Sequence, residues 1–375
     1  MAERPKVEIF FKQMASTLIK RSGEFPVVLL LTRCDGTYGK ELNLQGMFKE
    51  LNYLSDISES DLEGYTCEPK TTYNAIKYCF ANNPKKVILS NYKWSVTWQK
   101  LKEKGLTNCI IAKADINSDG VEELTTYITS LANNEGHGCC FVSCGDNTSN
   151  IPYLRDMHYI QIAKSVDYYG TDGRELSDYE KNALYAGAIA ACGCDRSLTN
   201  YTLPLISSVE YRENATGIDF TARGLISAEI MNGAVRVVAG VNTAEVSDEV
   251  TEDMQHIEVV QTMDMIRKDI SDTFAEYYRG AYKNNYNRQL LFIAAIKGYF
   301  TDLAGEEVLD PNFDNTCDVY VEAQRNAWLG YGKEEAESWS DDKVKLMSFG
   351  RKLFLTADIK ICQSMEDLTM YIILE

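Results

Sequence analysis

The sequence predicts an α/β domain followed by an α+β domain, with extended N- and C-terminal β-strand arms. Between about residues 26 and 201, apolar β-rich runs alternate with segments of helical spacing, which is typical of a sheet covered on both faces. After residue 225, a hairpin signal and two long helical segments are followed by separate strands. The predicted boundaries are 1–20, 21–205, 206–364 and 365–375, with the domain junction within residues 201–225.

The N-terminal arm is predicted from alternation. Val7, Ile9 and Phe11 occupy every second position shortly after Pro5, so their side chains share one face of a strand. A short strand at a chain terminus must join a sheet to pair its backbone.

The first domain is predicted to contain four buried strands and three helices. The strands are expected at 26–32, 86–92, 108–113 and 138–144, and the helices at 71–81, 94–103 and 120–131. Each strand is a continuous apolar run, as expected for parallel strands that are covered on both faces.

The second domain begins with a predicted hairpin, because the apolar runs 226–231 and 234–242 flank Asn232-Gly233. A first long helix is expected over 261–279. A second helix, over 288–303, is apolar nearly all round, which predicts deep burial. Strands are expected at 318–323, 352–361 and 368–374.

The last of these strands ends the chain and forms the predicted C-terminal arm. Its apolar residues on one face are Leu368, Met370, Ile372 and Leu374.

Composition and charge restrict the function. The 375 residues are 45% hydrophobic and 25% charged, which excludes a disordered or collagenous chain. The 38 basic and 55 acidic residues give a net charge of −17. We therefore expect no nucleic-acid partner and no binding to an anionic membrane surface, since both require positive charge.

The compartment is predicted from what the sequence lacks. No apolar run approaches the ~18–20 residues of a membrane span, so no direct membrane insertion is expected. The N-terminal residues do not resemble a secretory signal. The eleven cysteines are odd in number and fall mostly in apolar runs, which favours reduced core residues and assembly in a cytoplasm.

Catalytic and metal-binding signals are weak. His137 with Cys139, Cys140 and Cys144 lacks the regular spacing of a zinc site, and an apolar strand explains these cysteines better. Cys192-Gly-Cys194 is explained by small residues packing on a helix.

Two further motifs have simpler structural explanations. Residues 115–120 copy half a calcium loop, but Thr126 stands where the loop needs glutamate, which favours a helix cap at Asp119. Ser143 ends a strand, but no histidine is tied to it. No phosphate-binding loop is present. We predict no enzyme activity, no metal and no cofactor.

An ordered set of segments in the C-terminal half resembles the contractile tail sheath protein family of myovirus-like phages and R-type bacteriocins. Residues 7–31 and 184–202 resemble the same family's N-terminal arm and its small-residue helix. The segments are ARGLISAEIMNGAVRVVAGVNT (222–243), DMIRKDISDTFAEYYRGAYKNNY (264–286), LLFIAAIKGYFTDL (290–303), DVYVEAQ (318–324) and FLTADIKICQSMEDLTMYIIL (354–374).

The resemblance implies a structural subunit. Family members form six-membered rings stacked helically around an inner tail tube, and the stack contracts to drive the tube through a cell envelope. It also implies that both arms add strands to neighbouring subunits and that the α/β domain faces outward. The implied partners are further copies of the chain, the inner tube protein, and baseplate and tail-terminator proteins.

The resemblance further suggests that residues 334–347 form a helix facing the tube, with Asp341, Asp342, Lys343 and Lys345 as polar contacts. A solvated helix explains these four residues equally well. Two other functions stay open from the residues alone: an α/β enzyme with a nucleotide- or hydrolase-type N-terminal domain, and another phage tail or baseplate protein.

One arm alone is predicted to bind weakly. For residues 7–12, about four hydrogen bonds contribute ~1 kcal/mol each, and burial of Val7, Ile9 and Phe11 adds ~2 kcal/mol each. Ordering six or seven residues costs ~1–2 kcal/mol each. Since the sum is near zero, stable linkage should need both arms on subunits already held in a ring.

Overall fold

The computed structural model describes residues 18–22, 25–31, 46–66, 69–113, 124, 126–128, 130–131, 137–145, 155–215 and 217–374. The predicted N-terminal strand, the calcium-like residues 115–120 and half of the predicted helix at 120–131 lie outside them. The chain divides into two compact units. One comprises Met1–Arg21 and Asp269–Cys362, and the other comprises Ser22–Lys268 and Gln363–Glu375. They are called the helical unit and the sheet unit below.

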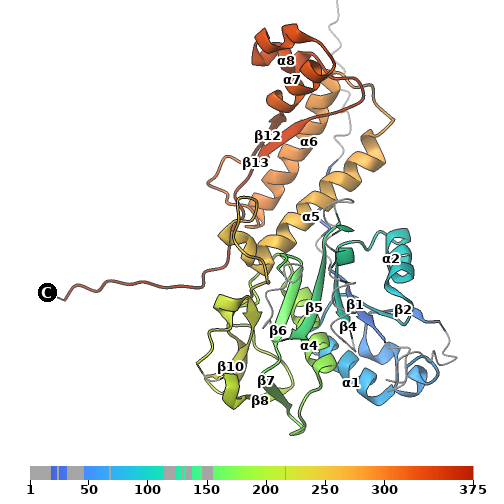
Figure 1. The fold of residues 1–375 in the computed structure, drawn as a ribbon, viewed down its shortest axis with the longest axis vertical. Coiled ribbons are helices and arrows are strands. Elements are labelled where there is room, and N and C mark those ends of the chain that lie inside the picture. Colours follow the sequence, from blue (N-terminus) through green and yellow to red (C-terminus); the bar gives the residue numbers. More distant parts are fainter. Residues whose placement is uncertain are drawn as a thin grey trace, which may run out of the picture. The chain divides into compact units, whose positions relative to one another are not determined.

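The sheet unit is built on a seven-stranded sheet with the order β2-β3-β1-β4-β5-β6-β9 (Figure 1). Only β2 is antiparallel to its neighbour. The strands are β1 (Val27–Leu30), β2 (Phe48–Leu51), β3 (Val87–Ser90), β4 (Cys109–Lys113), β5 (Cys139–Gly145), β6 (Tyr159–Ala163) and β9 (Leu225–Ile226). The four strands predicted for this region are β1, β3, β4 and β5, so the α/β prediction is confirmed here.

Helices cover both faces of this sheet. The helix α2 (Trp94–Glu103) contributes Trp98 and Leu101 to a buried cluster that contains Val28 and Phe141. Side chains alternate along a strand, so the fully buried Val27 points to the opposite face. The helix α4 (Asp178–Cys192) contacts β1, β4 and β5, and α1 (Pro69–Phe80) packs against α4.

The contact between α1 and α4 depends on a small residue. Gly187 of α4 lies so close to α1 that a Cβ atom there would be 2.4 Å from the backbone oxygen of Cys79. The run of small residues in α4 therefore serves helix packing, and Cys192, at the end of α4, is buried and free.

Replacing Gly187 by valine is expected to separate the two helices, because a backbone atom cannot move aside as a side chain can. We expect the free energy of unfolding to fall by about 2–3 kcal/mol. Denaturant unfolding of the variant measures this loss. The exposed Gly305, at the end of the helix α6 (Tyr286–Gly305), has open space where a Cβ would stand, so Gly305→Ala is the matched control. An unchanged midpoint in Gly187→Val would contradict the packing argument.

Two strand pairs complete the sheet unit. The strands β7 (Val166–Gly170) and β8 (Ile206–Tyr211) are antiparallel. The strands β10 (Ala228–Met231) and β11 (Ala234–Val237) form the predicted hairpin, whose two-residue turn has φ of 52° at Asn232 and 78° at Gly233. Positive φ at both positions is what a type I′ turn requires.

The helical unit contains the end of α5 (Ile257–Thr273) and the long helix α6, which share a buried hydrogen bond. The helix α5 enters this unit at Asp269 and continues as a π-helical turn, Phe274–Tyr278. The helix α6 follows it, and Tyr299 of α6 donates to Asp269 at 2.6 Å. Beyond α6 lie β12 (Thr316–Val319), α7 (Val321–Gly330), α8 (Asp341–Leu346) and β13 (Leu355–Asp358), with β12 and β13 antiparallel.

The domain boundary differs from the sequence-based one. Residues 201–225 do not separate the compact units, because β8 pairs with β7 and β9 joins the seven-stranded sheet. The division instead falls within α5, after Lys268. The hairpin predicted for the second domain therefore lies in the sheet unit.

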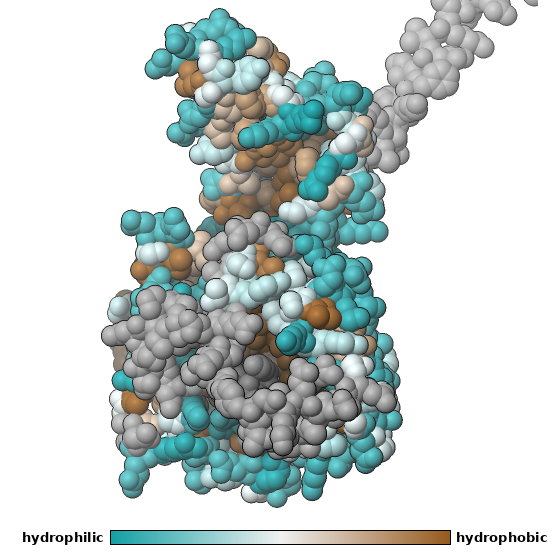
Figure 2. Space-filling view, turned by 45° about the vertical axis from the view of Figure 1, so that its right-hand side comes forward, coloured by the Kyte–Doolittle hydropathy of each residue, from teal (hydrophilic) through white to brown (hydrophobic). Residues whose placement is uncertain are grey.

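Three details of the predicted elements were wrong. The strand expected at 318–323 ends at Val319, because the helix-forming run from Val321 begins α7. The strand expected at 352–361 is confined to Leu355–Asp358. The helix α6 has an exposed face that includes Leu290, at 40% exposure, so it is not buried all round. Figure 2 shows residues of hydrophobic type (brown) at the surface of the helical unit.

Among the described residues, no helix combines the length and hydrophobicity needed to cross a membrane.

Candidate inter-subunit sites

The C-terminal tail is the most exposed hydrophobic segment that the structure describes. The strand predicted over 368–374 is not formed within this chain: residues 363–374 form no strand, and the tail leaves the sheet unit as an extended segment (Figure 1). Leu368, Met370, Ile372 and Leu374 are between 66% and 91% exposed, and so are no part of a core. An exposed apolar segment of this size indicates a binding site for another protein surface.

The opposite face of the tail is also apolar. Tyr371 is 92% exposed and Ile373 is 88% exposed. Only the first face was predicted from the sequence, although the same alternation places Tyr371 and Ile373 on the other. A strand with two apolar faces can be buried on both sides once its backbone is paired.

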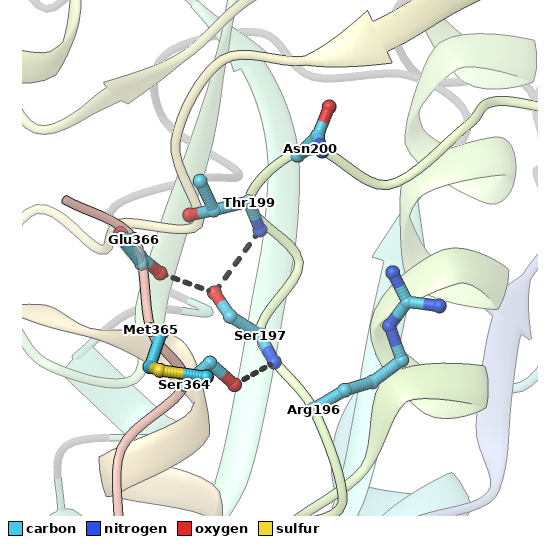
Figure 3. Close-up of a pocket in the computed structure, with 7 residues that line it drawn as sticks. All are labelled: Arg196, Ser197, Thr199, Asn200, Ser364, Met365 and Glu366. Atoms are coloured by element: carbon cyan, nitrogen blue, oxygen red, sulfur yellow. Dashed lines mark hydrogen bonds between the residues drawn. The ribbon is translucent and has the colours of Figure 1, made fainter. Parts of the chain in front are cut away.

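The base of the tail is held by hydrogen bonds within the sheet unit. Ser364 donates from its backbone N–H to Glu258 Oε1 at 2.9 Å and from its hydroxyl to Glu258 Oε2 at 2.8 Å. Ser197, just beyond α4, donates from its backbone N–H to Ser364 Oγ and from its hydroxyl to Glu366 (Figure 3). These contacts lie beside a cavity of about 240 Å³ lined by Arg196, Ser197, Thr199, Asn200, Ser364, Met365 and Glu366.

For the N-terminal arm, the structure describes only the residues at its C-terminal end, from residue 18 onward. Val7, Ile9 and Phe11 lie outside the described residues. Arg21, which follows the predicted arm, pairs with Glu306 directly after α6, at 2.6 Å. The described end of this segment therefore lies on the helical unit.

The pair β12–β13 is a two-stranded sheet in which no further strand of the described chain takes part. Three of the four residues of β13 are exposed. Such a pair has edge N–H and C=O groups free to bond with an added strand. In the described structure this sheet is thus a suitable acceptor for an extended segment.

The segment 334–347 is a short 3-10 turn followed by α8, packed on α7 around a small core of Ala336, Trp339 and Val344. Two of the four predicted contact residues already have partners within the chain. Asp341 accepts from Arg325 at 2.7 Å, and Lys345 donates to Asp318 at 2.6 Å.

The remaining pair is arranged differently. Lys343 lies with its Nζ 4.9 Å from the centre of the Trp339 ring, and Asp342 is exposed. The sequence analysis missed Arg325, which also donates to the backbone oxygens of Ala336 and Trp339. No spacing rule could have found it, because its partners lie on a separate turn.

The ion pair of Lys345 and Asp318 shifts both groups toward their charged forms. Burial opposes ionisation of Asp318, but the hydrogen bonds from Lys345 and from the backbone of Val319, together with the attraction of nearby lysines, outweigh it and lower the pKa of that carboxyl. The hydrogen bond to Asp318 raises the pKa of Lys345.

The candidates for metal binding and catalysis have structural roles. Cys139 and Cys140 are buried in β5; the hydrogen bond with Cys109 and burial raise the pKa of the Cys139 thiol, and burial raises that of Cys140. Ser143 is buried with its Oγ 2.7 Å from the hydroxyl of Tyr159. Among the described residues, no group of three or more potential ligands could hold a metal ion.

His158 is the histidine with the strongest interactions that the structure describes, and the sequence analysis gave it no role. Its Nε2 lies 2.9 Å from Asp264 Oδ2, and its Nδ1 lies 3.5 Å from Asp156 Oδ1. Burial lowers the pKa of His158, but attraction to Asp264 and hydrogen bonds with both carboxylates raise it to about 10. The arrangement joins β6 to α5 within the sheet unit.

Comparisons with known proteins agree with these observations. Residues 249–375 match the phage tail sheath C-terminal domain family. The tail sheath protein of Clostridium phage phiCD119 is 24% identical over 382 residues, and the alignment covers 99% of each chain.

Solved structures share the fold. The sheath tail protein of Desulfitobacterium hafniense has a TM-score of 0.63 at 14% identity and covers 84% of this chain and 94% of its own. The helical sheath of the anti-feeding prophage in its contracted state has a TM-score of 0.66 at 14% identity and covers both chains fully.

These matches confirm the resemblance to tail sheath proteins that the sequence predicted. They also confirm that the fold is the mixed α/β fold of sheath proteins. Because the relatives are structural proteins, the prediction of a non-enzyme is confirmed and the α/β enzyme alternative is set aside.

Proposed function

We propose that this chain, a structural subunit of a phage or phage-like contractile tail sheath, polymerises as six-membered rings stacked helically around an inner tail tube. A trigger at the baseplate then lets the stack shorten and drive the tube through a cell envelope. The observation that carries the proposal is the exposed apolar tail on a chain whose C-terminal residues 249–375 match a sheath domain.

In this proposal the tail adds a strand to a neighbouring copy. The two-stranded sheet β12–β13 supports this, because it offers exposed edge groups within the same family-matched region. Backbone hydrogen bonds would supply affinity, and side chains of the two tail faces would set the register.

The energy of one such contact is small. Burial of Leu368, Met370, Ile372 and Leu374 contributes about 2 kcal/mol each, and about three net hydrogen bonds add ~1 kcal/mol each. Ordering seven residues costs about 1–2 kcal/mol each. The net value is within a few kcal/mol of zero, so the sheath would be stable only because each subunit makes several such contacts at once.

The N-terminal residues Val7, Ile9 and Phe11 are proposed as the second arm, and its described end at Arg21 supports a start on the helical unit. For the tube contact we propose the segment 334–347. Since Asp341 and Lys345 already bond within the chain, Asp342 and Lys343 are the members of the set best placed to bind a partner.

The proposed partners are other copies of the chain, the tube protein, and baseplate and terminator proteins, with assembly in a bacterial cytoplasm. The α/β part, residues 21–205, is proposed to face outward. The acidic charge of −17 would keep unassembled subunits soluble at high concentration.

Electron microscopy of the purified, overexpressed chain tests the proposal. A sheath subunit is expected to form hollow cylinders of uniform diameter, built from rings with six-fold symmetry. Particles that stay discrete at all concentrations and salt conditions, or rings of another symmetry, would refute it.

A further inference from the structure

The attachment of the tail base is more specific than a simple chain exit requires. Glu258, at the first turn of α5, uses both carboxylate oxygens on one residue, Ser364. The hydroxyl of Ser364 also accepts the backbone N–H of Ser197 at 2.8 Å, so it is bonded in two directions. Ser197 Oγ then donates to Glu366 at 2.7 Å and accepts the N–H of Thr199 (Figure 3). We call these four residues (Ser197, Glu258, Ser364 and Glu366) the Ser364 clamp.

Burial changes abruptly at the clamp. Glu258 is 8% exposed and Ser197 is 6% exposed, whereas Met365 is fully exposed. A carboxylate that is mostly removed from water needs hydrogen-bond donors, and Ser364 supplies two. These hydrogen bonds therefore stabilise the clamp, with Ser364 bonded to Glu258, while the residues beyond it are in solvent.

We propose that the Ser364 clamp fixes the origin of the C-terminal arm, so that the arm begins at Asp367. This inference rests on the proposed function of the tail. A fixed origin leaves fewer residues to order when the arm pairs with a neighbour, which lowers the entropic cost of each contact. Ser364 and Glu258 are positioning residues, and neither touches the neighbour.

The clamp also limits the reach of the arm. The described arm residues, Asp367–Leu374, span about 26 Å when extended, at ~3.3 Å per residue. Opening the clamp frees Ser364, Met365 and Glu366 as well and adds roughly 10 Å. If a neighbour moves away during contraction, the clamp opens and lengthens the arm, so that the arm stays paired with the neighbour.

Hydrogen–deuterium exchange of the unassembled monomer tests the clamp directly. In the unmodified chain, the backbone amides of Ser197 and Ser364 are expected to exchange at least tenfold more slowly than those of residues 368–374. Glu258→Gln removes the charge of the acceptor of the Ser364 amide and should speed exchange there. Ser364→Ala removes the acceptor of the Ser197 amide, the Ser364 hydroxyl, and should abolish the protection of that amide. Ser364→Thr keeps a hydroxyl and should restore it.

The matched control is Glu249→Gln, which removes the same charge at an exposed position outside the clamp. Equal exchange at Ser364 and at residues 368–374 in the unmodified chain would overturn the proposal. So would unchanged protection in both Ser364→Ala and Glu258→Gln.

Assembly supplies the second measurement. Three additional residues to order should raise the critical concentration of Ser364→Ala by roughly a hundredfold or more. If the clamp variants lose protection but polymerise as the unmodified chain does, the clamp does not position the arm, and the inference is wrong. If a chain that lacks residues 367–375 still polymerises, the proposed function of the tail as an arm is wrong, whatever hydrogen exchange shows for the clamp.

Discussion

A chain that lacks residues 367–375 is expected to remain a folded monomer and to form no sheath. The deleted residues include the six exposed apolar side chains of the tail, while Glu366 and the rest of the Ser364 clamp stay in place. Because these side chains contribute nothing to the core, we expect the free energy of unfolding to change by less than ~0.5 kcal/mol. Sedimentation and negative-stain microscopy should show no polymer at a hundredfold higher concentration than the unmodified chain needs.

Point variants separate loss of apolar contact from loss of chain length. Leu368→Asp with Ile372→Asp places two charges on one face of the arm and should prevent assembly, since a buried, unpaired carboxylate is costly. The control, Val246→Asp, adds a charge at an exposed apolar residue outside the tail and should assemble. Sheaths of normal length from the double variant would show that this face is not buried between subunits.

Deleting residues 1–12 is expected to give the same result as deleting the tail. The two arms are proposed to act together, because each alone has a binding energy near zero. If only one deletion prevents assembly, the two-arm account is wrong for the other end of the chain.

The second large effect is expected at His158. Replacing it by glutamine takes from Asp264, at 3% exposure, its closer cationic partner and leaves the Arg267 guanidinium 3.7 Å away. Loss of one partner of a buried ion pair typically costs about 3–5 kcal/mol. Denaturant unfolding at pH 7 should show this loss. His256→Gln is the control, because it removes an imidazole from a less buried site. A loss below 1 kcal/mol in His158→Gln would contradict the assignment.

The same pair predicts a pH dependence. The pKa of His158 is about 10 in the folded chain against 6.5 as its ordinary value, so folding favours the protonated ring. Its contribution is complete below about pH 6.5 and is lost as the pH rises toward 10. The unmodified chain should therefore lose stability over this range, and His158→Gln should lose markedly less.

The arrangement around His158 has a further structural requirement. A Cβ atom on Gly138 would lie closer to the Asp264 carboxyl than atoms can approach, so Gly138 leaves the space that the carboxylate occupies. Asn108 bonds to both segments: its side-chain amide donates to the backbone oxygen of Asp264, and its Oδ1 accepts the backbone N–H of Gly138. His137 with Cys139, Cys140 and Cys144 gave only a weak metal signal in the sequence, whereas Gly138, which lies among them, is required by this packing.

The local elements were predictable where one rule dominated. Four buried strands followed from continuous apolar runs, and the hairpin followed from Asn232-Gly233. The strand expected over 318–323 was wrong because a four-residue strand is followed directly by a helix, and the apolar spacing of the two overlaps.

The sites were predictable only in part, for a physical reason. The exposed tail follows from its own residues, since alternation within seven positions is local information. The Ser364 clamp joins residues 106 and 167 positions apart, and Arg325 binds a separate turn. Such pairs depend on how distant segments pack, which no local pattern encodes.

A cryo-electron microscopy map of the polymer is the most direct measurement of the central claim, because it shows where residues 368–374 of each copy end. Our account predicts density for this segment as an added strand on a sheet of an adjacent copy, with continuous chain back to Glu366 of its own subunit. Density for the same segment packed against its own subunit in every ring would contradict it.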